Sequence, residues 1–402
     1  MQKRTSVVSL AAIVAIGGAM AALGGCSSTA YYWQGFKGQM QIMQAARPVD
    51  DWLNDSATPP ALQQRLRAAQ KMRRFASDAL ALPDNASYTR YAALERKYAV
   101  WNVVAAPPDS LKMHRWCFPI TGCISYRGYF AESDARAEAD EMQAQGYEVS
   151  VYGVPAYSTL GYLNWLGGDP LLSTFVEWQE GDFAGLLFHE LAHQLIYVKD
   201  DTAFNESFAM TVEAMATPLW LQNHASDATL KRWQQAQQRR KLWQQLTRGT
   251  RSKLEEVYEQ HSLTVQNTDR LSAIKSEVFN HFRTEYARLR AQWIEADEPL
   301  LTSDSLRQRY YERLAQTDDW VAHANNASFG ALAAYDDWVP AMSQWWKQLH
   351  QGQQPSPESW KTFYAQMREL SKLPAAERTQ RLCALVPADG RTPAACSEKK
   401  SE

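Results

Sequence analysis

The residues with the clearest chemical meaning lie between Phe188 and Gln194, where the sequence FHELAHQ contains the pattern HExxH. On an α-helix, positions i and i+4 share one face, so His189 and His193 can offer two imidazole nitrogens to one metal ion. Zn²⁺ suits imidazole and carboxylate ligands, with one position left for water. The ion lowers the pKa of that water, and Glu190 can accept its proton. This chemistry predicts hydrolysis of a peptide bond.

The residues around the motif predict a buried active-site helix, because its other positions are strongly apolar. They are Phe183, Leu186, Leu187, Leu191, Leu195 and Ile196. An unpaired polar group in such a place costs roughly 1–3 kcal/mol. A buried helix should therefore not carry two histidines and a glutamate without partners. A hydrogen-bonded pair of core histidines is the structural alternative.

A third ligand is needed to complete a zinc site. The metzincin pattern is absent, because Ile196 and Lys199 stand where that pattern has Gly and His. Downstream, residues 204–209 read FNESFA and are followed by Val212-Glu213. This stretch resembles the NExFA…VE sequence of the gluzincin aminopeptidases, in which a glutamate on the next helix completes the site.

The gluzincin resemblance implies that Glu206 is the third zinc ligand. Only twelve residues separate His193 from Glu206, fewer than in those enzymes, but a short loop can still return an antiparallel helix. Glu213, about two helical turns further on, is the rival ligand. If it does not bind the metal, it is expected to orient a ligand through a hydrogen bond. Asn205 and Asp201 are expected beside the site, Asp201 either orienting a ligand histidine or capping the helix.

Blocks of sequence over most of the chain resemble the bacterial "predicted aminopeptidase" lipoprotein family. They lie at 116–119, 126–130, 156–161, 169–174, 189–194, 201–209 and 325–327. The resemblance implies a zinc aminopeptidase that acts on peptides, although the GxMEN exopeptidase motif of the gluzincin aminopeptidases is absent. An endopeptidase of envelope proteins and a non-enzymatic envelope scaffold with a structural zinc are the alternatives.

Three further groups could contact a substrate. The segment from Val151 to Tyr157 is a candidate edge strand for an extended peptide, with an ordinary sheet strand as the alternative. Tyr157 and Tyr335 are candidates for stabilising the oxyanion of the tetrahedral intermediate. Arg127 could bind a substrate carboxylate, with a structural ion pair as the alternative.

The order of elements around the motif predicts an α+β, mainly α fold. Residues 116–130 and 147–157 favour strands, 131–145 favour a helix that Gly146 ends, and 181–223 favour two helices joined by a loop. We expect a gluzincin-like core, a small sheet with the HExxH helix and the glutamate helix, framed by helical regions.

The chain divides into five predicted segments. Residues 1–25 are a signal peptide, 26–108 a helical N-terminal region, 109–223 the catalytic core, 224–396 a helical C-terminal region and 397–402 a disordered tail. Long amphipathic helices are expected between residues 226 and 300 in particular, where Gln, Arg, Leu, Trp and Glu dominate.

The first 25 residues have the pattern of a secretion signal. A basic pair, Lys3 and Arg4, precedes an apolar run that ends in LGGC at Cys26. This resembles the lipobox of bacterial lipoproteins and implies a lipid anchor on Cys26 after cleavage. An uncleaved membrane anchor is the alternative. Serine, not aspartate, follows Cys26, which favours the outer membrane, with the protein facing the periplasm.

Composition supports a secreted globular protein. The chain has 45% hydrophobic and 21% charged residues and a net charge of −2, which gives no electrostatic case for nucleic-acid binding. The four cysteines after Cys26 predict disulfides in an oxidising compartment. Proximity favours Cys117–Cys123 and Cys383–Cys396, although four cysteines allow three connectivities; a cysteine metal site is the alternative.

Overall fold

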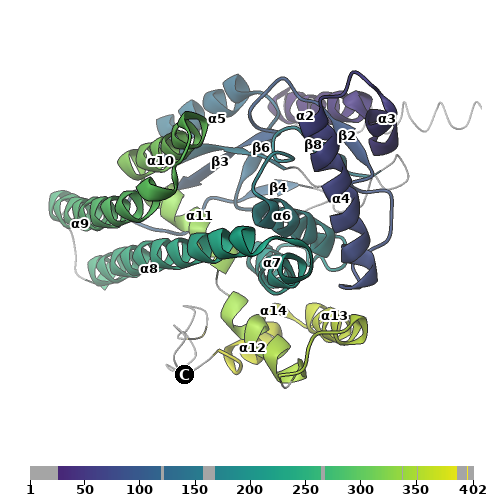
Figure 1. Cartoon of the computed structure of the whole chain (residues 1–402). Coiled ribbons are helices and arrows are strands. Elements are labelled where there is room, and N and C mark those ends of the chain that lie inside the picture. The colour runs from purple at the N-terminus through teal and green to yellow at the C-terminus, as the bar shows by residue number, and fades with distance from the viewer. Residues whose placement is uncertain are drawn as a thin grey trace, which may run out of the picture.

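The computed structural model describes residues 26–118, 122–156, 168–263, 268–336, 338–350, 352–386 and 396. The predicted signal peptide and C-terminal tail lie outside these residues. Within them the chain is mainly helical with small sheets, which confirms the predicted α+β, mainly α fold (Figure 1). None of the described helices is both long enough and apolar enough to cross a membrane.

The N-terminal part combines helices with a small sheet of order β1-β2-β8. Its elements are α2 (Cys26–Ala45), β1 (Ala46–Pro48), α3 (Val49–Asn54), α4 (Pro60–Asp78), β2 (Arg90–Ala92) and β8 (Leu171–Leu172). Pro60 opens α4 at a position where a missing backbone N–H costs nothing. The buried stripe of α4 carries Leu66, Ala69 and Met72 at helical spacing.

The prediction of a wholly helical region over 26–108 is wrong at its C-terminal end. Residues from 90 onward form β2 and then β3 (Val100–Ala106), which is the central strand of the sheet β6-β3-β7. Most side chains of β3 are buried, so the strand reads as a short apolar run without alternation. Such a run cannot be told from a buried helical segment by its period.

The predicted strands and helix of the middle region are confirmed. β4 (Trp116–Phe118) and β5 (Gly122–Ile124) pair as a hairpin, and β6 (Arg127–Tyr129) and β7 (Glu148–Val154) both pair antiparallel with β3. α5 (Glu132–Ala144) packs on this sheet, and Gly146 follows its end at φ +89°. Arg127 on β6 binds Glu138 on α5 at 3.1 Å, which is the structural ion pair considered for it.

Two helices occupy the centre of the main core. α6 (Glu180–His193) and α7 (Thr202–His224) pack along each other and are joined by the loop 194–201. Phe183 and Phe188 on α6 and Phe204 and Phe208 on α7 are fully buried between them and their neighbours. The two predicted helices over 181–223 are thus confirmed.

The C-terminal half is helical, as predicted. It contains α8 (Asp227–Leu263), α9 (Thr268–Asp297), the short 3₁₀ turn η2 (Glu298–Leu300), α10 (Asp304–His323), α11 (Asn326–Asp336), α12 (Val339–His350), α13 (Pro357–Ser371) and α14 (Ala375–Cys383). α8, α9, α10 and α11 contribute to a second apolar cluster, whereas α12, α13 and α14 join the main core below α7 (Figure 1).

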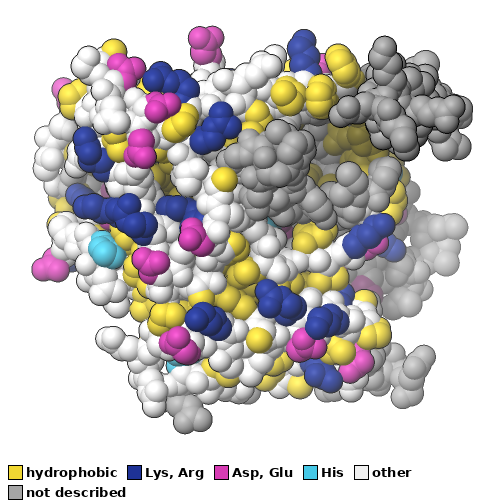
Figure 2. Space-filling view, turned by 90° about the vertical axis from the view of Figure 1, so that its right-hand side faces the viewer, with side chains coloured by type: hydrophobic (Ala, Val, Ile, Leu, Met, Phe, Trp, Pro, Cys, Tyr) yellow, Lys and Arg dark blue, Asp and Glu magenta, His cyan; other side chains and the backbone are white. Residues whose placement is uncertain are grey.

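Both disulfides favoured by proximity are present. Cys117–Cys123 closes the β4–β5 hairpin, and Cys383–Cys396 closes the segment after α14. Figure 2, which views the side where α2, α3 and α4 lie, shows charged side chains of both signs scattered among hydrophobic ones.

Candidate metal centre

The HExxH motif lies in the last two turns of α6. His189 and His193 stand one turn apart on the same face, and their Nε2 atoms are 3.1 Å apart. Both side chains are largely buried, at 13% and 8% exposure. Two imidazole nitrogens therefore point to one place from a helix whose other positions are packed in the core.

The third group comes from the second turn of α7. Glu206 Oε2 lies 3.5 Å from His189 Nε2 and 3.6 Å from His193 Nε2. One ligand atom from each of the three residues lies within 4.8 Å of the other two, so the group could hold a metal ion. The short loop of the sequence is thus long enough to bring Glu206 back to the two histidines.

Glu213 lies on the opposite side of the first histidine. Its Oε2 is 3.2 Å from His189 Nδ1, the ring nitrogen that faces away from His193 and Glu206. A hydrogen bond donated by Nδ1–H to this carboxylate leaves the Nε2 lone pair directed at the cluster. Gly185 permits the approach, since a Cβ there would lie 3.2 Å from Glu213 Cγ.

The charges of the cluster support one another. Burial alone would lower the pKa of His189, but hydrogen bonds to Glu206 and Glu213 outweigh it and hold that pKa well above its usual value. Burial alone would likewise raise the pKa of Glu206, yet the two histidines hold it well below its usual range. Burial would also raise the pKa of Glu213, but its hydrogen bond to His189, the charge of that histidine and Arg240 on α8, 3.8 Å away, lower it. Both glutamates are therefore ionised at neutral pH.

A Glu213→Gln variant is expected to bind zinc about 10- to 100-fold more weakly, because His189 Nδ1–H loses its ionic acceptor. Competition with a metal chelator measures the change. Glu358→Gln, on the exposed first turn of α13, is the matched control and should bind zinc as the wild type does. Equal affinity in the two variants would contradict a supporting role for Glu213.

Glu190 follows His189 and is half-buried on α6. The buried Tyr88 lies close enough to be affected by it: burial chiefly, and then the charges of Glu190 and Asp169, raise the pKa of Tyr88 well above its usual value. The charge of Glu190 is therefore felt at Tyr88, on the segment that precedes the sheet strand β2.

The segment 85–88 contacts the end of the HExxH helix and was not anticipated from the sequence. Asn85 Nδ2 donates to Gln194 Oε1 at 2.7 Å, and Gln194 Nε2 donates to Ser87 Oγ at 3.1 Å. Tyr88 has φ +64°, a costly conformation for a residue other than glycine. Pro83, Asp84 and Asn85 are residue types that favour a turn, but nothing local in the sequence indicates which helix this turn meets.

The loop between α6 and α7 is fixed at its C-terminal end. Asp201 caps α7, since its Oδ1 accepts from Phe204 N at 3.0 Å, and its Oδ2 accepts from Arg378 at 2.6 and 3.0 Å. The structure therefore shows the helix cap and not the alternative, in which Asp201 orients a ligand histidine: other groups engage both of its oxygens. Asn205 makes two 2.8 Å hydrogen bonds with the backbone of Val198, which holds the loop against α7.

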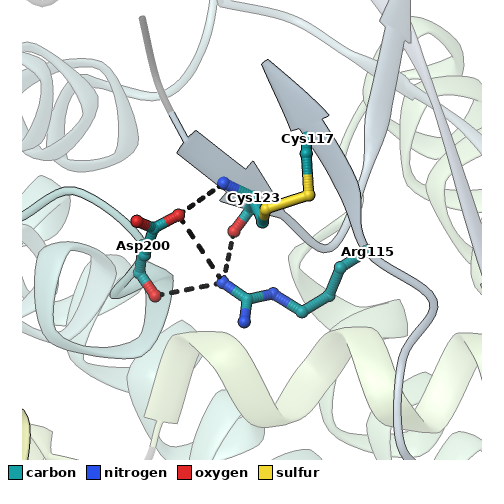
Figure 3. The surroundings of a disulfide bond; sticks show 4 residues. All are labelled: Arg115, Cys117, Cys123 and Asp200. Atoms are coloured by element: carbon teal, nitrogen blue, oxygen red, sulfur yellow. Dashed lines mark hydrogen bonds and ion pairs between the residues drawn. A yellow bond between two sulfur atoms is a disulfide. The ribbon is translucent and has the colours of Figure 1, made fainter. Parts of the chain in front are cut away.

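The neighbouring Asp200 attaches the same loop to the disulfide-closed hairpin (Figure 3). Cys123 N donates to Asp200 Oδ1 at 2.5 Å, and Arg115 donates to the carbonyls of Cys123 and Asp200. Gly122 must lack a side chain here, because a Cβ would lie 2.2 Å from Asp200 Oδ1. The loop that links the two helices of the site is thus held by the β4–β5 hairpin, which precedes it in the sequence, and by Arg378 on α14, which follows it.

An Asp201→Ala variant is expected to lose about 3 kcal/mol of stability, since it removes a helix cap and one partner of the buried Arg378. Asp201→Asn keeps a capping oxygen and should lose less. Urea unfolding of the three proteins measures the difference. Wild-type stability in the alanine variant would show that the cap and the ion pair do not hold the loop.

The sequence matches a model of a known protein family over most of its length. A family model described as "Putative aminopeptidase" matches residues 30–382. The chain belongs to this family. The match runs from α2 into α14 and so includes both helices of the site, and the description of the family indicates a peptidase. The comparison with curated proteins and the comparison with solved structures give no match.

Two of the substrate-side predictions for this aminopeptidase family member fall outside the described structure. Tyr157 lies outside the described residues, and of Tyr335 the structure describes only the backbone, on α11 against α7. The predicted edge strand is β7, which does lie at the edge of the sheet β6-β3-β7. Its pairing with a peptide stays a prediction, as does the oxyanion role of both tyrosines.

Proposed function

We propose that this protein is a zinc-dependent metallopeptidase that removes amino-terminal residues from peptides. The observation that carries the proposal is the convergence of His189 Nε2, His193 Nε2 and Glu206 Oε2 from two packed helices. The family to which the chain belongs supports the peptidase part. The resemblance of residues 204–213 to the gluzincin aminopeptidases supports the choice of Glu206 as a ligand.

The donor set fits zinc. Two imidazole nitrogens and one carboxylate oxygen are the ligands of a catalytic zinc site, which keeps one position for water or substrate. When bound, zinc supplies Lewis acidity, which polarises a carbonyl and lowers the pKa of a coordinated water. His189, His193 and Glu206 would hold the ion, and Glu213 would hold the ring of His189 in its binding tautomer.

Glu190 would move the proton. Glu190 follows His189 on α6 and is half-buried, and it would accept a proton from the attacking water and pass it to the departing amine. The chain itself thus supplies the ligands, their orientation and the acid–base group.

Paired peptides test the exopeptidase part of the proposal. Purified zinc-loaded protein is incubated with peptides that have a free amino terminus and with the same peptides after N-acetylation, and the products are identified by mass spectrometry. We expect stepwise removal of residues from the free peptides alone. Equal cleavage of both sets, or cleavage inside long chains, would replace the aminopeptidase with an endopeptidase.

We also propose that the protein is anchored through lipid on Cys26 and faces the periplasm at the outer membrane, on the basis of its lipobox pattern. Cell fractionation of a Cys26→Ser variant, with the mass of the wild-type N-terminal peptide, tests this. The wild-type peptide should carry acyl chains and the protein should sediment with the outer membrane. An unmodified Cys26 would contradict the proposal.

A further inference from the structure

The first helix of the described chain presents large aromatic side chains to solvent. Tyr32, Trp33 and Phe36 on α2 are 48%, 65% and 59% exposed. They account for three of the seven large hydrophobic side chains that are exposed among the described residues, and they lie within five residues of one another. Positions 32, 33 and 36 share one face of a helix, and the rings of Trp33 and Phe36 stack with centroids 5.8 Å apart.

The opposite face of α2 is attached to the rest of the protein. Gln34 Nε2 donates to Gly128 O at 3.3 Å, and its Oε1 accepts from Phe130 N at 3.1 Å. The ring of Phe130 lies directly on Gly38, where a Cβ would come within 2.0 Å of it. Tyr31 stacks on Phe118, with centroids 5.4 Å apart. These contacts fix the rotation of α2, so the three exposed aromatics cannot turn inward.

The position and the charge of this face indicate what covers it. Trp33 is seven helical residues from Cys26, about 10 Å along the axis, and so lies close to the start of α2. The only charged residue of α2 is Lys37, next to Phe36, and the helix contains no carboxylate. Tyrosine and tryptophan favour the membrane–water interface, and a lysine beside them complements anionic headgroups.

We propose that the face of α2 formed by Tyr32, Trp33 and Phe36 inserts into the interface of a phospholipid bilayer. This inference rests in part on the lipid anchor proposed for Cys26: with that anchor, the contact gives the protein two points of attachment and therefore one orientation. Hydrophobic side chains are exposed at the upper edge of the face in Figure 2, where α2 lies. α12, α13 and α14 lie at the opposite end of the molecule in Figure 1, so they would point away from the bilayer.

Fluorescence quenching by brominated lipid tests the contact without using peptidase activity. The protein as isolated from membranes is reconstituted in vesicles of phosphatidylethanolamine and phosphatidylglycerol, with and without brominated acyl chains. The emission of Trp33 is obtained by subtracting the tryptophan fluorescence of the Trp33→Phe variant from that of the wild type. Trp345→Phe, on α12 at the far end, is the matched control.

We expect the brominated vesicles to remove most of the Trp33 emission and to leave the Trp345 emission unchanged. Tyr32→Ser with Phe36→Ser should restore the Trp33 emission, because the remaining ring no longer holds the face in the bilayer. Both substitutions are at exposed positions, and unchanged thermal unfolding would confirm that they fold. Equal Trp33 emission in the two kinds of vesicle would overturn the proposal, as would equal quenching of Trp33 and Trp345.

Discussion

Replacing His193 with alanine is expected to abolish both zinc binding and peptide hydrolysis. His193 is buried at the end of α6 and its Nε2 is within 3.6 Å of both His189 and Glu206, so no other side chain of the cluster can take its place. The loss of zinc affinity should exceed the roughly 100-fold loss that follows from removing a hydrogen-bond partner of a ligand, because here a ligand itself is removed.

The metal content of the purified His193→Ala protein, together with its hydrolysis rate, measures this effect. His323→Ala, an exposed histidine on α10, is the control and should keep both zinc and activity. Thermal unfolding in the presence of a chelator shows whether the substitution disturbs the fold by itself. Stoichiometric zinc in His193→Ala would mean that the ion is held elsewhere.

Replacing Glu190 with glutamine is expected to separate catalysis from metal binding. The amide has the shape of the carboxylate but cannot accept a proton, so kcat/KM should fall by about 10²- to 10⁴-fold while zinc stays bound. A non-enzymatic scaffold with a structural zinc would show no such difference, since it has no reaction to lose.

Glu206→Gln is the companion to Glu190→Gln, with the same chemical change at a residue of the cluster. It should lose zinc and activity together, because its Oε2 lies within 3.6 Å of both histidines and would be a ligand. If Glu190→Gln lost zinc while Glu206→Gln retained it, the roles of the two glutamates would have to be exchanged. Kinetics and metal analysis on the same preparations make the comparison.

The HExxH helix and its partner were predictable because their signals are local. The spacing of His189 and His193 is a property of one helix, and the apolar positions around them predict its burial. The return of Glu206 rested on resemblance to a family with the same two helices. The end of the predicted helix at Gly146 was likewise a local signal, because glycine readily adopts the positive φ found there.

The features that were missed depend on distant parts of the chain. β3 looked like a continuation of the helical region, because a central strand buried on both faces loses its alternation. The contact of Asn85 and Ser87 with Gln194 joins residues more than 100 positions apart. The ion pair of Asp201 with Arg378 spans 177 positions, and no local pattern pairs one aspartate with one arginine among many.

These long-range contacts explain how the site keeps its shape. The loop between the two helices is held from one side by the hairpin that Cys117–Cys123 closes, and from the other by α14, next to the disulfide Cys383–Cys396. The N-terminal segment holds the end of α6 through Gln194. The ligands lie close together in sequence, but segments far before and far after them position them.

X-ray absorption at the zinc edge of the purified, metal-replete protein tests the site most directly. The account predicts one zinc ion per chain with two imidazole nitrogens at about 2.0–2.1 Å and a carboxylate oxygen at about 2.0–2.2 Å. The imidazole contribution to the zinc spectrum should disappear in His189→Ala and in His193→Ala, because neither variant is expected to keep zinc at this site. A spectrum dominated by sulfur ligands, or one that neither substitution changes, would contradict it.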